Sequence, residues 1–507
     1  MSKTGKYLSN FIVGSLLTTT MLTPVYSQSV QENINSEANP VFTETVQQAD
    51  ARRRDINDLS SADARRNQLL GIDQPAVVTP QPAPLVLPSS TQQRAQPALA
   101  ATPITNPADP DGSSLGNIAV DPVQTGTPAT QEIDPFAPTG IRLGTFDLNV
   151  SLEQAIGYSN NVSQQANGDG GAFSETTVSA NITSDWSRHE WQTNLNGTYR
   201  RPFDDEEIDQ PQLTIDTALR LDLIDGYTLT TDGFYNITTQ GFTSSTLAPG
   251  AIDNPIVESW GGGVELQRTD RKLQLTLRGD VERDEFQSSD LGGGIVQNEG
   301  DQNNTEYRAT ARVGYEVSPA ITPFVEGAYA IRDFDQESDR NGNDRDSDIF
   351  ELRGGVEIDL GEKLNGEIAL GYVNEKFDDP LLEDLDAFTI NGQLNWSPER
   401  DTQIALTLGT TTNNSITANE NGSIIYNGRL DATRQITSRF SVNAFADAQI
   451  ETNDDNNQTL QVGIGTQYWV NRFMAITSQV DYQRFETDAP NSSFDATSGQ
   501  LGLRFQK

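Results

Sequence analysis

Cysteine is absent from the 507 residues of this chain, and histidine occurs once. Without cysteine, no disulfide framework, zinc–thiolate site or cysteine nucleophile can form. Basic residues are scarce too, with 34 Lys and Arg against 72 Asp and Glu, which gives a formal net charge of -38. Nucleic-acid binding needs Lys and Arg contacts to phosphate, so no nucleic-acid partner is expected. No cofactor motif is present, and no cofactor is expected.

Apolar residues are the next shortage. Hydrophobic types make up 35% of the chain, and the mean hydropathy is -0.53. A globular chain of this length normally carries more apolar core, divided among several domains. Beyond the N-terminal region, no run of about 18 apolar residues exists to form a membrane helix.

What the chain has instead is a regular alternation of apolar and polar residues from about residue 146 to the end. The stretch at 273–282 shows it, with apolar Leu273, Leu275, Leu277 and Val281 between polar Gln274, Arg278, Asp280 and Glu282. In water, a sheet with one apolar face needs a second layer, and no helical layer is predicted here. The pattern fits strands whose apolar face meets lipid and whose polar face lines a wet interior. The predicted fold class is therefore all-β, a transmembrane antiparallel β-barrel.

Long acidic or polar loops alternate with short turns along this region, from the first loop at 159–173 to the last at 486–494. Their succession predicts about 18 strands, the first at 146–158. Short turns are typically periplasmic and long loops extracellular, so both ends of the barrel should face the periplasm.

The N-terminal region has a different composition. Lys3 and Lys6 precede a short apolar stretch, and small residues before Gln28 suit cleavage, so residues 1–27 are predicted to be a signal peptide. Residues 28–138, rich in Pro, Gln and Ala, are predicted to be a disordered periplasmic linker. A short helix at 50–70 carries several arginines; it is either a solvated, transient helix or a docking segment for a partner or peptidoglycan. The barrel then covers 139–507, and the expected location is the outer membrane of a Gram-negative bacterium.

The stretch DPFAPTGIRLGTFDL, residues 134–148, leads into the alternating region. With the alternating region, it resembles the outer-membrane β-barrel porin family found in alphaproteobacteria, over roughly residues 134–507. The resemblance implies a barrel fold and an outer-membrane location, and it supplies no catalytic residues.

At about 18 strands, a barrel interior is wide enough for an aqueous channel. Alternation places charged side chains of both signs on the inward face. The candidate pore-lining residues are Arg200, Arg220, Arg278, Arg308, Arg312, Arg353, Arg429, Asp216, Asp280, Glu282, Glu351 and Glu357. Two interpretations stay open for each: it contributes to a transverse field that selects solutes, or it pairs with a neighbouring strand and stiffens the wall.

A constriction loop is also predicted. The loop at 241–255 is the least charged of the long loops, and Leu247, Pro249 and Ile252 are its candidates for packing inward. An ordinary surface loop is the alternative, and the loop at 286–303 is the competing candidate. The acidic run Asp339 to Asp348 suggests either a calcium site, although the full ligand loop is missing, or simple solubility.

No enzymatic activity is expected, because the single histidine, His189, lies in a short turn and leaves no Ser-His-Asp set. The predicted function is passive diffusion of small hydrophilic solutes. The alternatives are export of surface polysaccharide and a structural barrel that ties the outer membrane to the cell wall. Expected partners are outer-membrane lipid and lipopolysaccharide, the barrel-assembly machinery and the diffusing solutes. The oligomeric state is open, with a trimer among the options.

Overall fold

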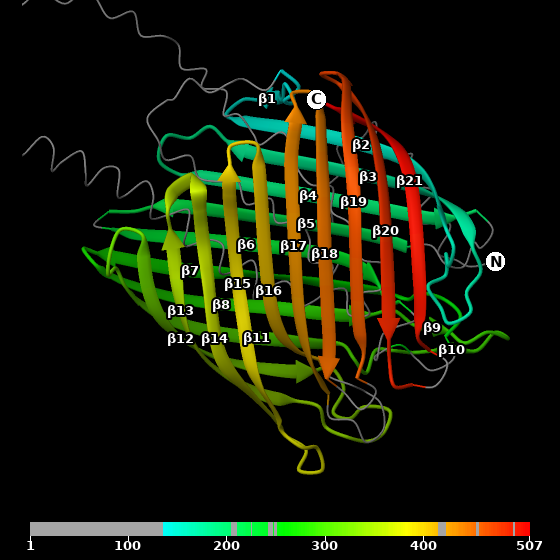
Figure 1. Cartoon of the computed structure of the whole chain (residues 1–507). Helices are drawn as coiled ribbons and strands as arrows, with labels where there is room; N and C mark the ends of the chain where they lie inside the picture. Colours follow the sequence, from blue (N-terminus) through cyan, green and yellow to red (C-terminus); the bar gives the residue numbers. More distant parts are fainter. Residues whose placement is uncertain are drawn as a thin grey trace, which may run out of the picture.

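Eighteen long antiparallel strands form one closed barrel, as the alternation predicts. The computed structural model describes residues 135–203, 210–224, 226–241, 247, 251–413, 422–452, 456–489 and 492–507. Each long strand pairs with the next one along the chain, and the first and last, β2 and β21, lie side by side and close the ring (Figure 1). The predicted signal peptide and helix, and all but the last residues of the predicted linker, lie outside the described residues.

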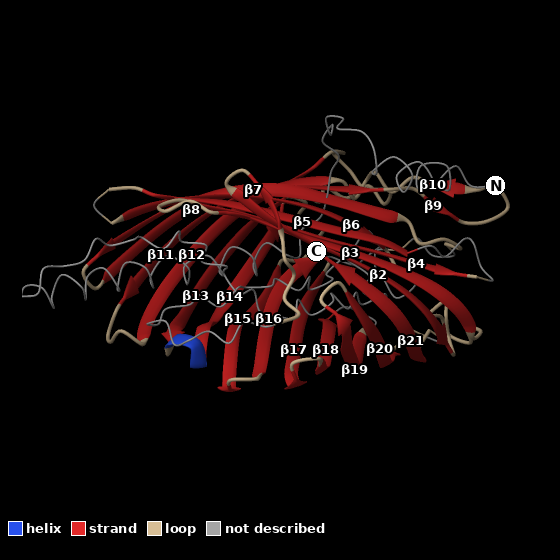
Figure 2. Cartoon of the chain, turned by 90° about the horizontal axis from the view of Figure 1, so that it is seen from above, coloured by secondary structure: helices blue, strands red, loops and turns tan. Residues whose placement is uncertain are grey.

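The long strands are 12 to 15 residues long, which suits a tilted crossing of a bilayer. Their bounds are β2 Phe146–Ser159, β3 Gly171–Ser184, β4 Glu190–Pro202, β5 Gln210–Asp222, β6 Tyr227–Thr239, β7 Ile256–Asp270, β8 Leu273–Phe286, β11 Asn304–Tyr315, β12 Ile321–Phe334, β13 Ser347–Asp359, β14 Leu364–Phe377, β15 Leu385–Glu399, β16 Thr402–Asn413, β17 Ser423–Thr437, β18 Phe440–Thr452, β19 Gln458–Asn471, β20 Met474–Glu486 and β21 Phe494–Gln506. From above, strands β4 to β8 and strands β15 to β21 form two facing curved walls (Figure 2).

The two faces of each strand differ because successive side chains point to opposite sides of a sheet. In β8, Leu275 and Leu277 are exposed on the outer face, whereas Gln274, Thr276 and Arg278, which alternate with them, are buried on the inner face. The strand register places outward residues beside outward residues and inward residues beside inward ones. Leu277 pairs with Ala311 of β11, and Arg278 pairs with Thr310. An apolar exterior around a polar interior is the arrangement that lipid requires.

The barrel seam has an extra strand that the sequence did not predict. Strand β21 covers β2 only as far as Val150, whose backbone exchanges hydrogen bonds with Lys507. Beyond that point, β1 (Ile141–Leu143) pairs with β2 in the place that β21 would occupy. Gly144 forms the turn between β1 and β2 with a φ of 66°, a conformation that other residues adopt at a cost. The approach segment, residues 135–143, thus completes the seam rather than forming only turns.

The two ends of the barrel differ in their connections. Strand β1 and the C-terminus lie together at one end, where the short turns also gather (Figure 1). At the other end, the long connection after β8 contains a small hairpin of β9 (Ser289–Asp290) and β10 (Val296–Gln297). One 3-10 turn, Gly361–Lys363, joins β13 to β14. Within the described residues, no helix has the length and apolar character needed to cross a membrane.

Candidate functional site

The inward face of the barrel carries the predicted pore-lining residues. The burial pattern and strand register place all of them on the polar side, opposite the exposed apolar residues. Their role in lining an open water path stays a prediction. What the structure adds is how they are paired, and this differs around the ring.

The strongest pairing is on β11 to β14. Arg312 on β11 donates to Glu326 on β12 at 2.6 Å and to Glu367 on β14 at 2.8 Å. Its guanidinium also lies 4.0 Å from the ring centroid of Phe324, a cation–π arrangement. All three polar side chains are at most 10% exposed. A cation held by two carboxylates in this way spans several strands and stiffens the wall.

The same pattern continues toward the long-loop end of the barrel. Arg353 contacts both Glu326 and Glu351, and Arg308 reaches Glu351 at 3.4 Å. Three further ion pairs belong to the same network: Arg308–Glu306 at 2.7 Å, Arg332–Glu306 at 2.9 Å and Arg332–Glu375 at 2.8 Å. We call this connected set, Arg308, Arg312, Arg332 and Arg353 with Glu306, Glu326, Glu351, Glu367 and Glu375, the arginine ladder.

Other inward arginines form smaller groups of the same kind. Arg278 on β8 contacts Asp232 on β6 at 2.7 Å and Asp280 at 2.5 Å. The further pairs are Arg429 with Asp431 and Asp447, Arg220 with Asp222 and Glu190, and Arg200 with Glu175. The remaining predicted residues Asp216, Glu282 and Glu357 lie on the same inward face, with Glu282 and Glu357 buried.

The inward face of β15, β16, β19 and β20 is almost free of charge. Amides dominate it, including the buried Asn391, Gln461 and Gln483. Asp481 is the one charged inward residue among the described residues of these four strands. Neutral hydrogen bonds are made here, as from Gln164 Nε2 to Gln483 Oε1 at 3.2 Å. We call this surface the amide wall.

The two loops that compete as constriction candidates contact each other. The backbone N–H of Ile252 donates to the Asp290 carbonyl at 2.8 Å, and the N–H of Asp290 donates to Asp253 Oδ1 at 2.9 Å. Ile252 is 44% exposed and Leu247 is half-buried. Pro249 lies outside the described residues. A constricting role for this loop pair stays a prediction.

A third long loop joins this group through Arg340. Its guanidinium contacts Glu299 at 2.5 Å and Asp301 at 2.6 Å, both in the loop after β8. Burial raises the pKa of Asp301, but hydrogen bonds from Arg340 and its positive charge lower it more, so the net pKa is below the ordinary value. We call Arg340, Glu299 and Asp301 the loop clasp.

In the acidic run from Asp339 to Asp348, which suggested a calcium site, the Asp339 carboxylate is hydrogen-bonded by groups of the same loop. Asp339 accepts from the backbone N–H groups of Asn341 and Asn343 and from Arg345 Nε, at 2.8, 3.0 and 2.9 Å. These bonds outweigh the effect of burial and hold the pKa of Asp339 below its usual range. In the part of the chain that the structure describes, no group of three or more His, Cys, Asp or Glu could hold a metal ion.

The approach segment binds at the opposite, short-turn end. Phe136 is 8% exposed and stacks on Trp469, an inward residue of β19, with ring centroids 6.4 Å apart. The Arg439 guanidinium also lies over the Phe136 ring, 4.9 Å from its centroid. The Phe136 carbonyl accepts from Gln506 Nε2 at 2.6 Å. The segment is therefore anchored to β19 and β21 at the mouth of the barrel.

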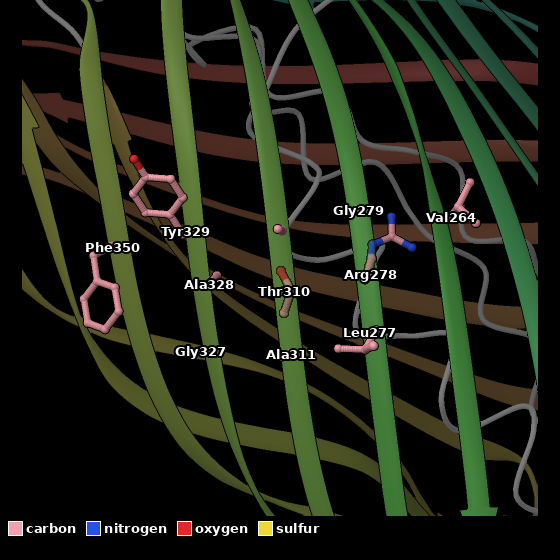
Figure 3. Close-up of a pocket in the computed structure, with 11 residues that line it drawn as sticks. Val264, Leu277, Arg278, Gly279, Thr310, Ala311, Gly327, Ala328, Tyr329 and Phe350 are labelled. Atoms are coloured by element: carbon pink, nitrogen blue, oxygen red, sulfur yellow. The ribbon is translucent and has the colours of Figure 1, made fainter.

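The outward face has two notable features. Near the long loops, Tyr329, Tyr372 and Tyr482 each donate to an Asp on the next strand, at 2.5, 2.6 and 2.7 Å. Lower on the wall, an outward hollow of about 550 Å³ lies over Gly279, Ala311 and Gly327, with Leu277 and Phe350 among the side chains around it (Figure 3). Because its lining is outward and mainly apolar, this hollow faces lipid rather than the interior.

Some ladder residues were not singled out from the sequence. Arg332, Glu306 and Glu375 lie near strand ends, where alternation is hard to follow without known bounds. Counting by twos from Glu326 reaches Arg332, so the signal is present in the sequence. The sequence does not indicate that Trp469 points inward, because aromatic residues at strand ends usually face the membrane–water interface.

Comparison with known proteins agrees with the barrel fold. The family model described as "Putative beta-barrel porin 2" matches residues 134–507. No curated protein matches the chain. Solved structures similar to it include the copper transporter OprC, with 10% identity, a TM-score of 0.40 and coverage of 73% of this chain and 81% of that chain.

Two porins are also similar. OpdK from Pseudomonas aeruginosa has 10% identity and a TM-score of 0.34, covering 71% of this chain and 99% of that chain. A BenF-like porin from Pseudomonas fluorescens Pf-5 has 10% identity and a TM-score of 0.35, covering 72% and 100%. The family match over the whole described barrel decides the assignment. This chain belongs to the putative β-barrel porin 2 family and is a porin-like outer-membrane β-barrel.

Proposed function

We propose that this protein is an outer-membrane channel through which small hydrophilic solutes diffuse passively. The observation that carries the proposal is an inward face that is polar around a closed ring of 18 strands. A ring of this size encloses space beyond what its own side chains need. Water and polar solutes are the contents that such a face favours.

The orientation follows from the two ends of the barrel. Strand β1, the approach segment and Lys507 lie at the short-turn end, which is periplasmic in barrels of this class. The residues before 135 then belong in the periplasm. The loop clasp and the β9–β10 hairpin belong on the extracellular side.

The proposal includes the absence of enzymatic activity. His189 is the single histidine of the sequence, and it is half-buried in the turn between β3 and β4. That turn is at the periplasmic end, away from the outer leaflet where a lipid-modifying site would be needed. Many of the inward carboxylates contact an arginine, which supports a structural or electrostatic role for them.

The expected partners fit the outward face. Tyrosine with an apolar ring and a polar hydroxyl suits the headgroup region, and the three Tyr–Asp pairs lie at the extracellular end of their strands. This supports contact with the lipid and lipopolysaccharide of the outer leaflet. The last strand presents exposed Leu501, Leu503 and Phe505, which suits recognition by the barrel-assembly machinery.

Liposome swelling tests the proposal. Vesicles that contain the full-length protein should take up small neutral sugars, at a rate that falls as solute size increases. Vesicles with the same protein left unfolded are the control. Folded barrels that admit no solute would contradict the proposal and would favour the polysaccharide-export or structural alternative.

A further inference from the structure

The charges on the inward face are not balanced. Among the inward positions of the described strands, Asp and Glu are more than twice as frequent as Arg, and no Lys is present. Strand β8 shows the imbalance, with Asp280, Glu282 and Asp284 inward beside the single Arg278. A pathway lined mostly by one sign of charge raises the local concentration of the opposite ion.

Pairing masks the arginines, because most of them are held by carboxylates, and the carboxylates in excess keep the net charge of the inward face negative. Arg312 lies between Glu326 and Glu367, at 2.6 and 2.8 Å, and Arg332 lies between Glu306 and Glu375, at 2.9 and 2.8 Å. A guanidinium with two carboxylates nearby offers little attraction to an anion in the lumen. The field that a diffusing solute meets is therefore negative.

The inward face of β6, β7 and β8 also has more carboxylates than arginines. Arg278 is directed to Asp232 and Asp280, at 2.7 and 2.5 Å. Glu265 and Asp284 lie on the same inward face, and each is 4% exposed. Asp232, Glu265 and Asp280 thus place three carboxylates around one guanidinium on three neighbouring strands. The amide wall adds almost no charge of either sign.

We propose that the pathway prefers cations, so that its substrate class is small hydrophilic cations and neutral solutes rather than anions. The inference rests on the proposed channel function, and it adds the sign of charge that the channel admits. Rings of Asp and Glu produce cation preference in other pores by the same electrostatic mechanism. The preference should weaken at high salt, because mobile ions screen the wall charges.

The test is the zero-current potential of the full-length protein in a planar bilayer under a KCl gradient. We expect the sign of a potassium-selective pore and a K⁺/Cl⁻ permeability ratio above one that approaches one as salt increases. Conductance steps with a ratio at or below one would overturn the inference and leave the channel function standing. Folded protein that gives no steps would overturn both.

A pair of variants locates the effect. The double variant Glu190→Gln and Asp222→Asn keeps side-chain size and removes two charges from the inward face of β4 and β5, so the permeability ratio should fall toward one. The matched control is Asp386→Asn with Asp495→Asn, two carboxylates on the outward face, which should leave the ratio unchanged. An unchanged ratio in the inward variant, or an equal change in the control, would contradict the assignment. If the inward variant fails to fold, the wild-type ratio and its salt dependence still decide.

Discussion

The arginine ladder and the amide wall are neighbours on one barrel, yet they solve the same problem differently. Both must keep polar side chains satisfied on an inward face. The ladder does so with charge-assisted bonds across β11 to β14, such as Arg312–Glu326 at 2.6 Å and Arg332–Glu306 at 2.9 Å. The amide wall uses mainly neutral bonds, such as Gln164–Gln483 at 3.2 Å and Asn395–Asn365 at 3.3 Å.

The difference indicates a division of roles. Bonds between ions are stronger but leave a costly charge behind when one partner is lost. Neutral amides are weaker individually and tolerate substitution. The ladder should therefore determine the shape and electrostatic field of the barrel, while the amide wall supplies an inert polar surface for solutes.

The largest effect is expected from breaking the ladder. Arg312→Met leaves Glu367 buried, with its main cationic partner removed, and should destabilise the barrel by about 3–5 kcal/mol. Urea unfolding of the protein in lipid vesicles, followed by tryptophan fluorescence, measures this. Arg312→Lys keeps the charge but not the fork of donors, so its loss should be smaller. If Arg312→Met costs no more than a substitution in the amide wall, the two regions do not differ as described.

The next effect concerns the apolar anchor of the amide-wall side. Phe136 packs on Trp469 of β19 and on Ala475 of β20, so Phe136→Ala should cost about 3 kcal/mol. The same unfolding experiment, with proteolysis of the 135–143 segment, reports the loss. Phe136→Leu retains apolar contact and should lose less. A variant with unchanged stability and an unchanged cleavage rate would show that the approach segment does not hold the seam.

A small effect is expected within the amide wall itself. Gln483→Met has similar volume and removes one neutral hydrogen bond with Gln164, so it should change the free energy of unfolding by about 1 kcal/mol or less. Its free energy of unfolding, measured in the same experiment as that of Arg312→Met, compares the amide wall with the arginine ladder. A loss as large as that of the ladder variant would mean that amides, too, carry the wall's stability.

The smallest effect is local and depends on pH. The pKa of Asp301 is lowered in the folded protein, from an ordinary value of 3.8, so the loop clasp is fully stabilising at neutral pH and weakens as pH falls below that value. Protection factors for hydrogen exchange in residues 335–346, which correct for the slower intrinsic exchange in acid, should fall in that acidic range, while those of β11 to β14 stay high. Asp301→Asn should lower the protection factors of this loop already at neutral pH and reduce their dependence on pH. Equal protection factors at both pH values in the wild type would contradict this.

Alternation was enough to predict the strands and the inward face. Leu273 to Glu282 shows why, since a period of two reveals both faces of a strand without knowledge of its partners. The partners themselves depend on register and tilt around the ring. Arg312 and Glu367 are 55 residues apart, and only the stacking of three strand pairs brings them within 2.8 Å. The Phe136–Trp469 contact joins residues still farther apart, so no local pattern could indicate it.

The central claim is that the polar interior is a water path, and single-channel recording tests it most directly. The full-length protein, refolded and inserted into a planar bilayer, should give stable conductance steps that scale with salt concentration. A folded barrel that inserts and remains silent would contradict the account.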